Sequence, residues 1–278
     1  MSAPFPSKFT SEFTSEFTSR TAPESTSRST SECASGGRFS SEERFPSEER
    51  FASEERPVTL DRREGPYGEV VLRRRGASPG VLEIIENGCF LMDTSDGRSE
   101  RRLVDAALAA LPAGLAAPEV LIGGLGVGFS LVRAAEEARW GRITVVEREP
   151  AVVEWHRAGP LAEISAAALA DPRVRIVQAD LVRHIRTTGE RYAALCLDID
   201  NGPGWTVTDD NGSLYSPSGL RACRERLLPG GVLAVWSAQP SAEFEKALRN
   251  AGFDGVTTEE ISVARGVPDV VHLGVLAA

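Results

Sequence analysis

Residues 120–130 read VLIGGLGVGFS, a short apolar run followed by a glycine-rich loop. Gly124, Gly126 and Gly128 come directly after the predicted strand and directly before a stretch with helical periodicity. Glycines at such a junction permit a tight turn and let backbone N–H groups approach a bound ligand closely. This stretch therefore predicts a ligand-binding strand–loop–helix unit.

The spacing of these glycines discriminates between nucleotide ligands. A dinucleotide-binding loop has the pattern G-x-G-x-x-G, whereas this loop reads G-x-G-x-G and places Phe129 at the position of the third glycine, which disfavours NAD. Glu147 ends the next apolar stretch about 20 residues further on, where a carboxylate can accept both hydroxyls of a ribose. Glu149 is the alternative for that role. Asp180 ends the following strand, where it would meet an adenine edge.

Each of these features taken singly is better explained as a solvated strand end or a helix cap. Three successive strands that end in a glycine loop, a glutamate and an aspartate favour a nucleoside site instead.

From residue 118 onward, apolar runs alternate with amphipathic stretches. This alternation predicts a mostly parallel sheet that is covered by helices on both faces. In such sheets a ligand binds beyond the carboxyl ends of the strands, where the strand order reverses. The predicted strands are 119–124, 142–147, 174–180, 192–200, 232–237 and 270–277, and the predicted helices are 129–141, 150–159, 162–172, 181–189, 217–231 and 241–252.

The chain before this unit divides into two further parts. Residues 1–57 repeat F-T-S-E and then R-F-x-S-E-E, with too few apolar residues to form a core, so we predict a disordered tail. Residues 58–96 carry short β-rich segments separated by Gly, Asn and Pro, which predict a β hairpin or meander. A helix over 98–112 then opens the larger domain, 97–278.

Composition excludes several classes of protein. The chain has 278 residues and a net charge of −9, which argues against a nucleic-acid surface and against an anionic membrane partner. No apolar run reaches the ~18 residues that a membrane span needs. The four cysteines show no C-x-x-C spacing, which favours a reduced, cytoplasmic protein without a metal site. They are Cys33, Cys89, Cys196 and Cys223.

Nucleophilic catalysis has no support in the sequence. The chain lacks a G-x-S-x-G stretch. Its three histidines, His156, His184 and His272, fall in two separate predicted helices and in the last strand. Histidines placed in this way are more often satisfied or solvated side chains than bases, so we predict no histidine base.

A second stretch, LCLDIDNGPGW at residues 195–205, ends a predicted strand with Asp198 and Asp200. Side chains alternate along a strand, so both carboxylates point to one face. A carboxylate beside an amine attracts it and accepts its proton, which makes these two acids the candidate catalytic residues. The alternative is that both cap backbone groups in a turn. The loop that follows predicts a lid, with Trp205 and Tyr215 covering the site.

Two longer stretches carry a resemblance to a known family. Residues 147–180, with the D-P-R-V step, and residues 214–241, LYSPSGLRACRERLLPGGVLAVWSAQPS, resemble spermidine synthases, within the class I S-adenosylmethionine-dependent transferase superfamily. The resemblance runs along roughly residues 66–278. It implies an α/β fold with a doubly wound, mostly parallel Rossmann-like methyltransferase sheet, an antiparallel last strand and a small N-terminal β meander.

The same resemblance implies an activity and its partners. Spermidine synthases move an aminopropyl group from decarboxylated S-adenosylmethionine to a small amine, and members of this type often pair as homodimers. By this resemblance Asp198 matches the first acid of the acceptor motif, and Tyr67 matches the tyrosine of an N-terminal Tyr-Gln pair.

Three departures from the family pattern keep other functions open. Gly126 stands where the glycine loop of the family has an Asp that holds the amino group of the donor. Asn201 stands where the acceptor motif has its second Asp, and Gly68 replaces the glutamine of the Tyr-Gln pair. The alternatives are a methyltransferase that uses intact S-adenosylmethionine, and a nucleoside-binding scaffold without turnover.

Overall fold

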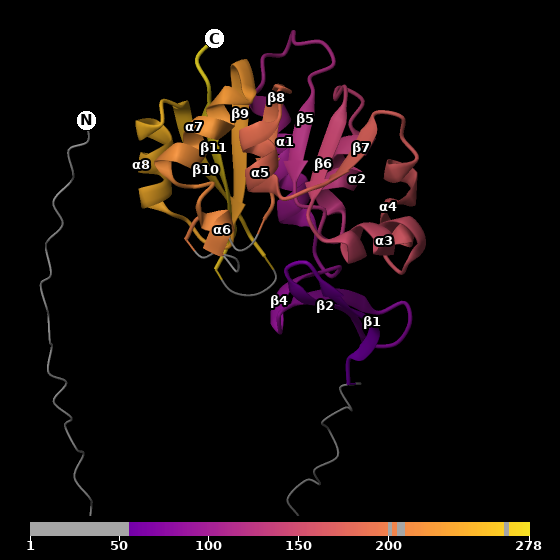
Figure 1. The fold of residues 1–278 in the computed structure, drawn as a ribbon. Helices are drawn as coiled ribbons and strands as arrows, with labels where there is room; N and C mark the ends of the chain where they lie inside the picture. Colours follow the sequence, from indigo (N-terminus) through magenta and orange to yellow (C-terminus); the bar gives the residue numbers. More distant parts are fainter. Residues whose placement is uncertain (1–55, 200–201, 205–208, 264–266) are drawn as a thin grey trace, which may run out of the picture. The chain divides into compact units, whose positions relative to one another are not determined.

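The computed structural model describes residues 56–199, 202–204, 209–263 and 267–278. They belong to a compact unit that extends from Phe51 to Ala278. Within the described residues, a small antiparallel sheet precedes a larger mixed sheet with helices on both faces (Figure 1). The tail predicted over 1–57 lies almost entirely outside the described residues.

The small sheet has four antiparallel strands in chain order. Its inner strands bury Val70, Leu72 and Ile84, as the predicted meander requires. The first strand was not predicted, because VTLDRREG is charged and mostly exposed, as suits an edge strand. The strands are β1 (Val58–Gly65), β2 (Gly68–Arg75), β3 (Val81–Glu86) and β4 (Cys89–Asp93).

The large sheet has seven strands in the order β10-β11-β9-β8-β5-β6-β7. Strands β9, β8, β5, β6 and β7 run parallel, whereas β11 and β10 are antiparallel, which confirms the predicted antiparallel last strand. The sequence did not predict β10, because DGVTTEEI lacks a buried apolar face. The strands are β5 (Val120–Gly123), β6 (Ile143–Glu147), β7 (Val174–Gln178), β8 (Tyr192–Leu197), β9 (Leu227–Ser237), β10 (Asp254–Ile261) and β11 (Asp269–Val275).

The helices follow the predicted alternation and end earlier than predicted, with the largest differences in α2 and α7. Helix α2 stops at Glu136 rather than at Gly141, and the Arg173 guanidinium donates hydrogen bonds to the carbonyls of Ala135 and Glu137 at this end. Helix α7 stops at Glu225, and the LLPGG segment begins β9 instead. The helices are α1 (Arg98–Ala110), α2 (Phe129–Glu136), α3 (Pro150–Ala158), α4 (Ala162–Leu169), α5 (Leu181–Thr187), α6 (Asp209–Gly212), α7 (Pro217–Glu225) and α8 (Ala242–Asn250).

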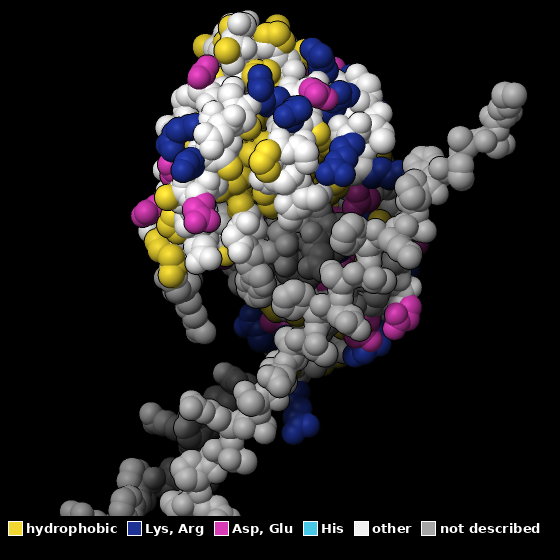
Figure 2. Space-filling view, turned by 60° about the vertical axis from the view of Figure 1, so that its left-hand side comes forward, with side chains coloured by type: hydrophobic (Ala, Val, Ile, Leu, Met, Phe, Trp, Pro, Cys, Tyr) yellow, Lys and Arg dark blue, Asp and Glu magenta, His cyan; other side chains and the backbone are white. Residues whose placement is uncertain are grey.

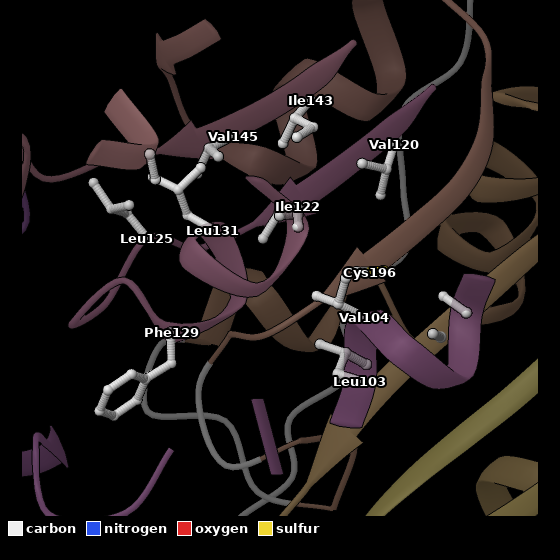
Figure 3. Packing of buried hydrophobic residues seen from close by; sticks show 14 of the residues in the cluster. Leu103, Val104, Val120, Ile122, Leu125, Phe129, Leu131, Ile143, Val145 and Cys196 are labelled. Carbon is white, nitrogen blue, oxygen red and sulfur yellow. The ribbon is translucent and has the colours of Figure 1, made fainter. Parts of the chain in front are cut away.

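Two hydrophobic layers hold the helices against the sheet. Val120 and Ile122 of β5 point into the layer formed with α1 and α2, and Figure 3 shows Ile122 near Leu131 of α2. Leu121, between them, points to the opposite layer with α5, α7 and α8. Each fully buried aliphatic side chain of this kind contributes about 1.5–3 kcal/mol to stability.

The strand order reverses between β5 and β8. From β5 the chain proceeds outward through β6 and β7 on one side, then returns to β8 and β9 on the other. The connections after β5 and β8 therefore diverge and leave a crevice at the carboxyl ends of the strands. The glycine loop and Asp198 follow these two strands, so the fold brings them together.

The surface of the described residues is of mixed charge on the face that Figure 2 draws. Lys and Arg side chains are scattered there among hydrophobic and uncharged side chains instead of gathering in a continuous track. No helix among the described residues combines the length and the apolar character required to cross a membrane.

Candidate functional site: an acidic cavity at the strand switch point

A cavity of about 1300 Å³ lies at the carboxyl ends of the parallel strands. Its wall combines the small sheet, through Glu86 and Met92, with the glycine loop and the ends of β6, β7 and β8. A cavity of this size is large enough for a ligand with several groups. Most of the acids that the sequence singled out belong to its wall.

The glycine loop takes a backbone shape that side chains would prevent. Gly124, Gly126 and Gly128 all have positive φ, at 93°, 50° and 96°. A Cβ at Gly124 would overlap the carbonyl oxygen of Asp198, and a Cβ at Gly126 would overlap the sulfur of Met92. Gly124 and Gly126 line the cavity, whereas Gly128 lies outside its wall as the N-cap of α2.

A buried histidine fixes this loop from behind. His156 Nε2 lies 2.8 Å from the carbonyl oxygen of Gly126, and its Nδ1 lies 2.7 Å from Ser165 Oγ. A carbonyl only accepts, so Nε2 carries the proton in the neutral ring and Ser165 donates to Nδ1. Burial lowers the pKa of His156, which favours this neutral form. His156 is thus a satisfied structural histidine, as the sequence indicated.

Glu147 lies where the sequence placed it, at the end of β6 and in the cavity wall. Its Oε2 accepts a hydrogen bond from Leu125 N at 2.9 Å, and its Oε1 accepts one from Glu149 N at 2.7 Å. The carboxylate therefore ties the glycine loop to the start of α3 and still faces the cavity.

Asp180 lies in the cavity wall after β7. Its Oδ1 accepts a hydrogen bond from Arg183 N at 2.7 Å, so it caps α5. The helix-cap role and the predicted contact with an adenine edge are compatible, because a carboxylate has several acceptor positions.

Asp198 follows β8 and shares the cavity with two further acids. Its Oδ2 accepts a hydrogen bond from Ser130 Oγ at 2.8 Å. Glu100 of α1 and Asp269 of β11 also line the cavity, and Ser99 Oγ lies 3.2 Å from Glu100 Oε2 and 2.7 Å from Asp269 Oδ2. We call Asp198, Glu100 and Asp269 the acid cluster.

Burial makes the charged forms of the acid cluster costly. It raises the pKa of Asp198, although the hydrogen bond from Ser130 opposes this shift. The pKa of Glu100 is raised by burial and by the charge of Asp198, and burial likewise raises that of Asp269. Carboxyls in this state hold a proton or take up a cation readily, which suits both proton acceptance and ammonium binding.

Sequence reasoning missed two members of this cluster. Glu100 lies three and four residues before Leu103 and Val104, so it belongs to the buried face of α1, and an acid on an apolar face was the available signal. Asp269 begins an apolar strand, and its place beside Asp198 depends on the antiparallel return of β11, which sequence periodicity does not reveal.

The remaining predicted residues divide into two groups. Tyr67 and Tyr215 lie outside the cavity wall. The ring of Tyr67 is exposed and lies 4.6 Å from the Arg148 guanidinium, whereas Tyr215 is buried against Phe244, with ring centroids 5.5 Å apart. Tyr215 is thus part of the core rather than a cover over the cavity. Asp200, Asn201 and Trp205 lie outside the described residues, so their roles stay predictions.

The described residues contain no group of three or more His, Cys, Asp or Glu side chains placed to bind a metal ion.

Comparison with characterised sequences identifies aminopropyltransferases as relatives. The chain is 33% identical over 138 residues to polyamine aminopropyltransferase 1 of Pseudomonas aeruginosa, covering 49% of this chain and 46% of that protein. It is 28% identical over 178 residues to polyamine aminopropyltransferase 1 of Streptomyces coelicolor, covering 63% of this chain and 32% of that protein. The chain thus spans less than half the length of these relatives. No family model matches it.

Comparison with solved structures gives the same fold. Spermidine synthase from Thermotoga maritima superposes with a TM-score of 0.62 at 16% identity, covering 78% of this chain and 72% of that one. A spermidine synthase in complex with the transition state analogue AdoDATO superposes equally well at 17% identity, covering 78% of this chain and 73% of that one.

Sheet order, switch-point cavity and glycine loop thus define a chain with the class I S-adenosylmethionine-dependent transferase fold. Within that class, the chain is similar in structure to spermidine synthases over 78% of its length, and in sequence to polyamine aminopropyltransferase 1 of Pseudomonas aeruginosa over about half.

Proposed function

We propose that this chain is a spermidine synthase-like transferase that moves an aminopropyl or related alkyl group from decarboxylated S-adenosylmethionine to a small amine. The observation that carries the proposal is the acid cluster, which lies in one cavity with the glycine loop. An ammonium group suits that cluster because it supplies the cation that buried carboxyls otherwise lack.

The cavity residues fit a nucleoside donor. Gly124 and Gly126 form part of the cavity wall, at the strand switch point where nucleotides bind in such folds. Glu147 is placed to accept ribose hydroxyls, and Asp180 to meet the adenine edge. The donor carries its own leaving group, so these residues need only to bind and orient it.

Asp198 acts as the proton acceptor. An amine enters as its ammonium form, and Asp198 takes the proton that blocks its lone pair. The free nitrogen then attacks the donor carbon next to the sulfonium, so that a C–N bond forms while the C–S bond breaks and its electron pair returns to sulfur. The products are the alkylated ammonium and methylthioadenosine. Glu100 and Asp269 stabilise the positive charge near the reacting nitrogen.

A second candidate function is methyl transfer from intact S-adenosylmethionine. The observation that favours it is Gly126: Met92 fills the space of a side chain there, so the loop cannot present the Asp by which the family pattern holds the donor's amino group. Binding without turnover is the third possibility, and the same experiment discriminates among the three.

Calorimetry on the full chain tests the proposal. The first function predicts tighter binding of decarboxylated S-adenosylmethionine than of the intact donor, and formation of methylthioadenosine when a diamine is added. Tighter binding of the intact donor, with transfer of its methyl group, would establish the second function. Binding of methylthioadenosine without turnover on a panel of diamines would support the third possibility, a nucleoside-binding protein without catalytic activity. No binding of any of these nucleosides would overturn the nucleoside site.

A further inference from the structure

Glu149 is a further acid in the cavity wall and does not belong to the acid cluster. Its side chain is 3% exposed, and both carboxyl oxygens are buried without a hydrogen bond among the described residues. Glu149 nevertheless lines the cavity. A buried carboxyl left in this state costs free energy, so it points to a ligand group that completes it.

The neighbouring charges do not satisfy Glu149. Arg148 forms a buried ion pair with Glu86 of β3 and stacks over the ring of Tyr67. Burial raises the pKa of Glu149, and the charges of Glu86 and Glu147 raise it further, while Arg148 opposes them. Glu149 therefore keeps its proton to a higher pH than an ordinary glutamate, and in that protonated form the carboxyl has one O–H donor and a free acceptor oxygen.

The backbone of Glu149 is held at the carboxylate of Glu147, the proposed ribose position, and both residues line the cavity. Glu149 N donates to Glu147 Oε1, and the other oxygen of Glu147 accepts from Leu125 in the glycine loop. On its far side the carboxyl of Glu149 lies against Gly65, where a Cβ would overlap it. A glycine at the end of β1 therefore makes the room that Glu149 occupies.

We propose that Glu149 binds the ribose hydroxyls of the nucleoside together with Glu147, an inference that rests on the proposed function. The two groups are complementary in hydrogen bonding: Glu147 already accepts two N–H groups and can only accept from a hydroxyl, whereas Glu149 can donate to one hydroxyl and accept from the other.

Calorimetry on the full chain with methylthioadenosine and its 2′,3′-dideoxy analogue tests this assignment. Glu149→Leu should weaken binding of methylthioadenosine about tenfold while leaving the dideoxy analogue unchanged, because only the former has the lost partner. Glu149→Gln, whose amide also donates and accepts, should stay within about threefold of the wild type. Equal losses for both nucleosides, or no loss for either, would overturn the inference. So would a selective loss of diamine affinity in Glu149→Gln, which would make this an ammonium site.

A second variant keeps Glu149 in the sequence but moves its carboxyl group out of position. Gly65→Ala puts a methyl group where the carboxyl lies, so it should reproduce the selective loss for methylthioadenosine even if Glu149→Leu fails to fold. Gly189→Ala is the matched control, because a Cβ there meets open space. Equal binding by both alanine variants would contradict the assignment. If the wild-type chain binds no methylthioadenosine, the proposed function fails first and this inference falls with it. If the wild-type chain binds methylthioadenosine and the Glu149 variants bind it equally well, only this inference fails and the proposed function stands.

Discussion

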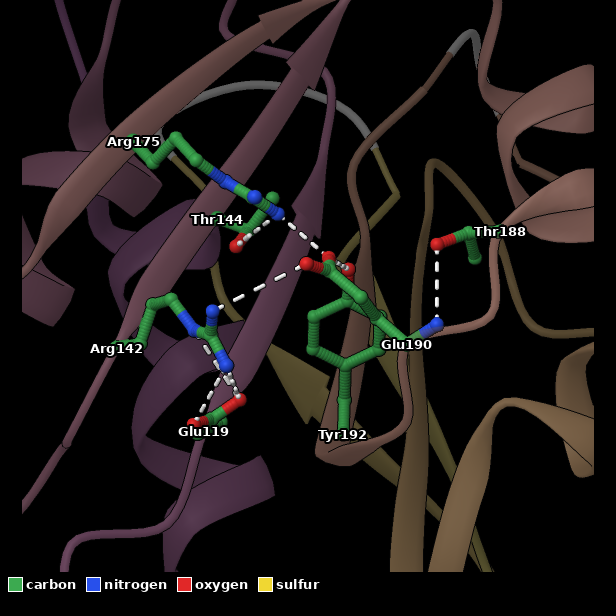
Figure 4. Close-up of polar contacts among 7 residues, drawn as sticks. All are labelled: Glu119, Arg142, Thr144, Arg175, Thr188, Glu190 and Tyr192. Carbon is green, nitrogen blue, oxygen red and sulfur yellow. Dashed lines mark hydrogen bonds and ion pairs between the residues drawn. The ribbon is translucent and has the colours of Figure 1, made fainter.

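Acidic side chains at the two ends of the large sheet have pKa values shifted in opposite directions. At the amino end of the parallel strands, Glu119 lies 2.7 Å from Arg142 and Glu190 lies 2.5 Å from Arg175 (Figure 4). Tyr192 also donates to Glu190, and these contacts lower the pKa of Glu190 to about 2.

At the carboxyl end, the acids of the cluster receive hydrogen bonds from serines, and burial raises their pKa values. The same residue type in one sheet is therefore held in its charged form at one end and pushed toward its neutral form at the other. The difference is the presence of an arginine partner. It indicates that the amino end contributes to stability, whereas the carboxyl end keeps its acids available for a ligand cation.

The largest expected effect is the loss of turnover in Asp198→Asn. An amide has the shape of the carboxyl but cannot take the proton, so aminopropyl transfer should fall about 10²- to 10⁴-fold while nucleoside affinity stays near normal. A steady-state assay with calorimetry measures both. Asp171→Asn, at the amino end, is the control and should retain turnover. Unchanged turnover in Asp198→Asn would remove this residue from the mechanism.

Glu100→Gln should raise the stability of the fold while it lowers the affinity for the acceptor amine. The folded pKa of Glu100 lies above its ordinary value, so the folded state loses stability as pH rises through the range between the two. The amide removes this penalty, and the free energy of unfolding at pH 8 should rise by about 1–3 kcal/mol. Acceptor affinity should fall, because one ammonium partner is lost. Denaturation at pH 5 and pH 8 measures the first effect, and a lower stability at pH 8 would contradict the raised pKa.

Several residues of the site at the carboxyl end of the sheet were predictable from the sequence. Gly124, Glu147 and Asp198 stand directly after apolar runs, and parallel strands bring such positions to one edge. Glu100 and Asp269 were not predicted as site residues, because they reach the cavity from an amphipathic helix and an antiparallel strand. Their meeting with Asp198 depends on tertiary packing.

The edge strands β1 and β10 were also not predicted from the sequence. β1 and β10 carry polar sequences without a buried apolar face, and their pairing is decided by the neighbours β2 and β11. The arginine pairs at the amino end were equally invisible, because their partners are up to 48 residues apart in the sequence, as with Arg142 and Glu190.

The smallest expected effect is at the amino end. Glu190→Gln removes the negative charge that pairs with Arg175 and should destabilise the fold by about 1 kcal/mol or less at pH 7, since the pair is partly exposed. The lowered pKa means that this stabilisation is present above the ordinary glutamate pKa and is lost as pH falls toward 2. The wild type and the variant should therefore converge in thermal denaturation at acid pH. Altered nucleoside affinity would contradict a purely structural role.

The most direct test of the account is a crystal structure of the full chain with methylthioadenosine and a diamine. The account predicts the nucleoside against Gly124 and Gly126, and one amine nitrogen within about 2.6–3.2 Å of the Asp198 carboxyl, the reach of a proton acceptor. A diamine bound elsewhere, with the side chain of Asp198 turned to bulk water, would contradict it.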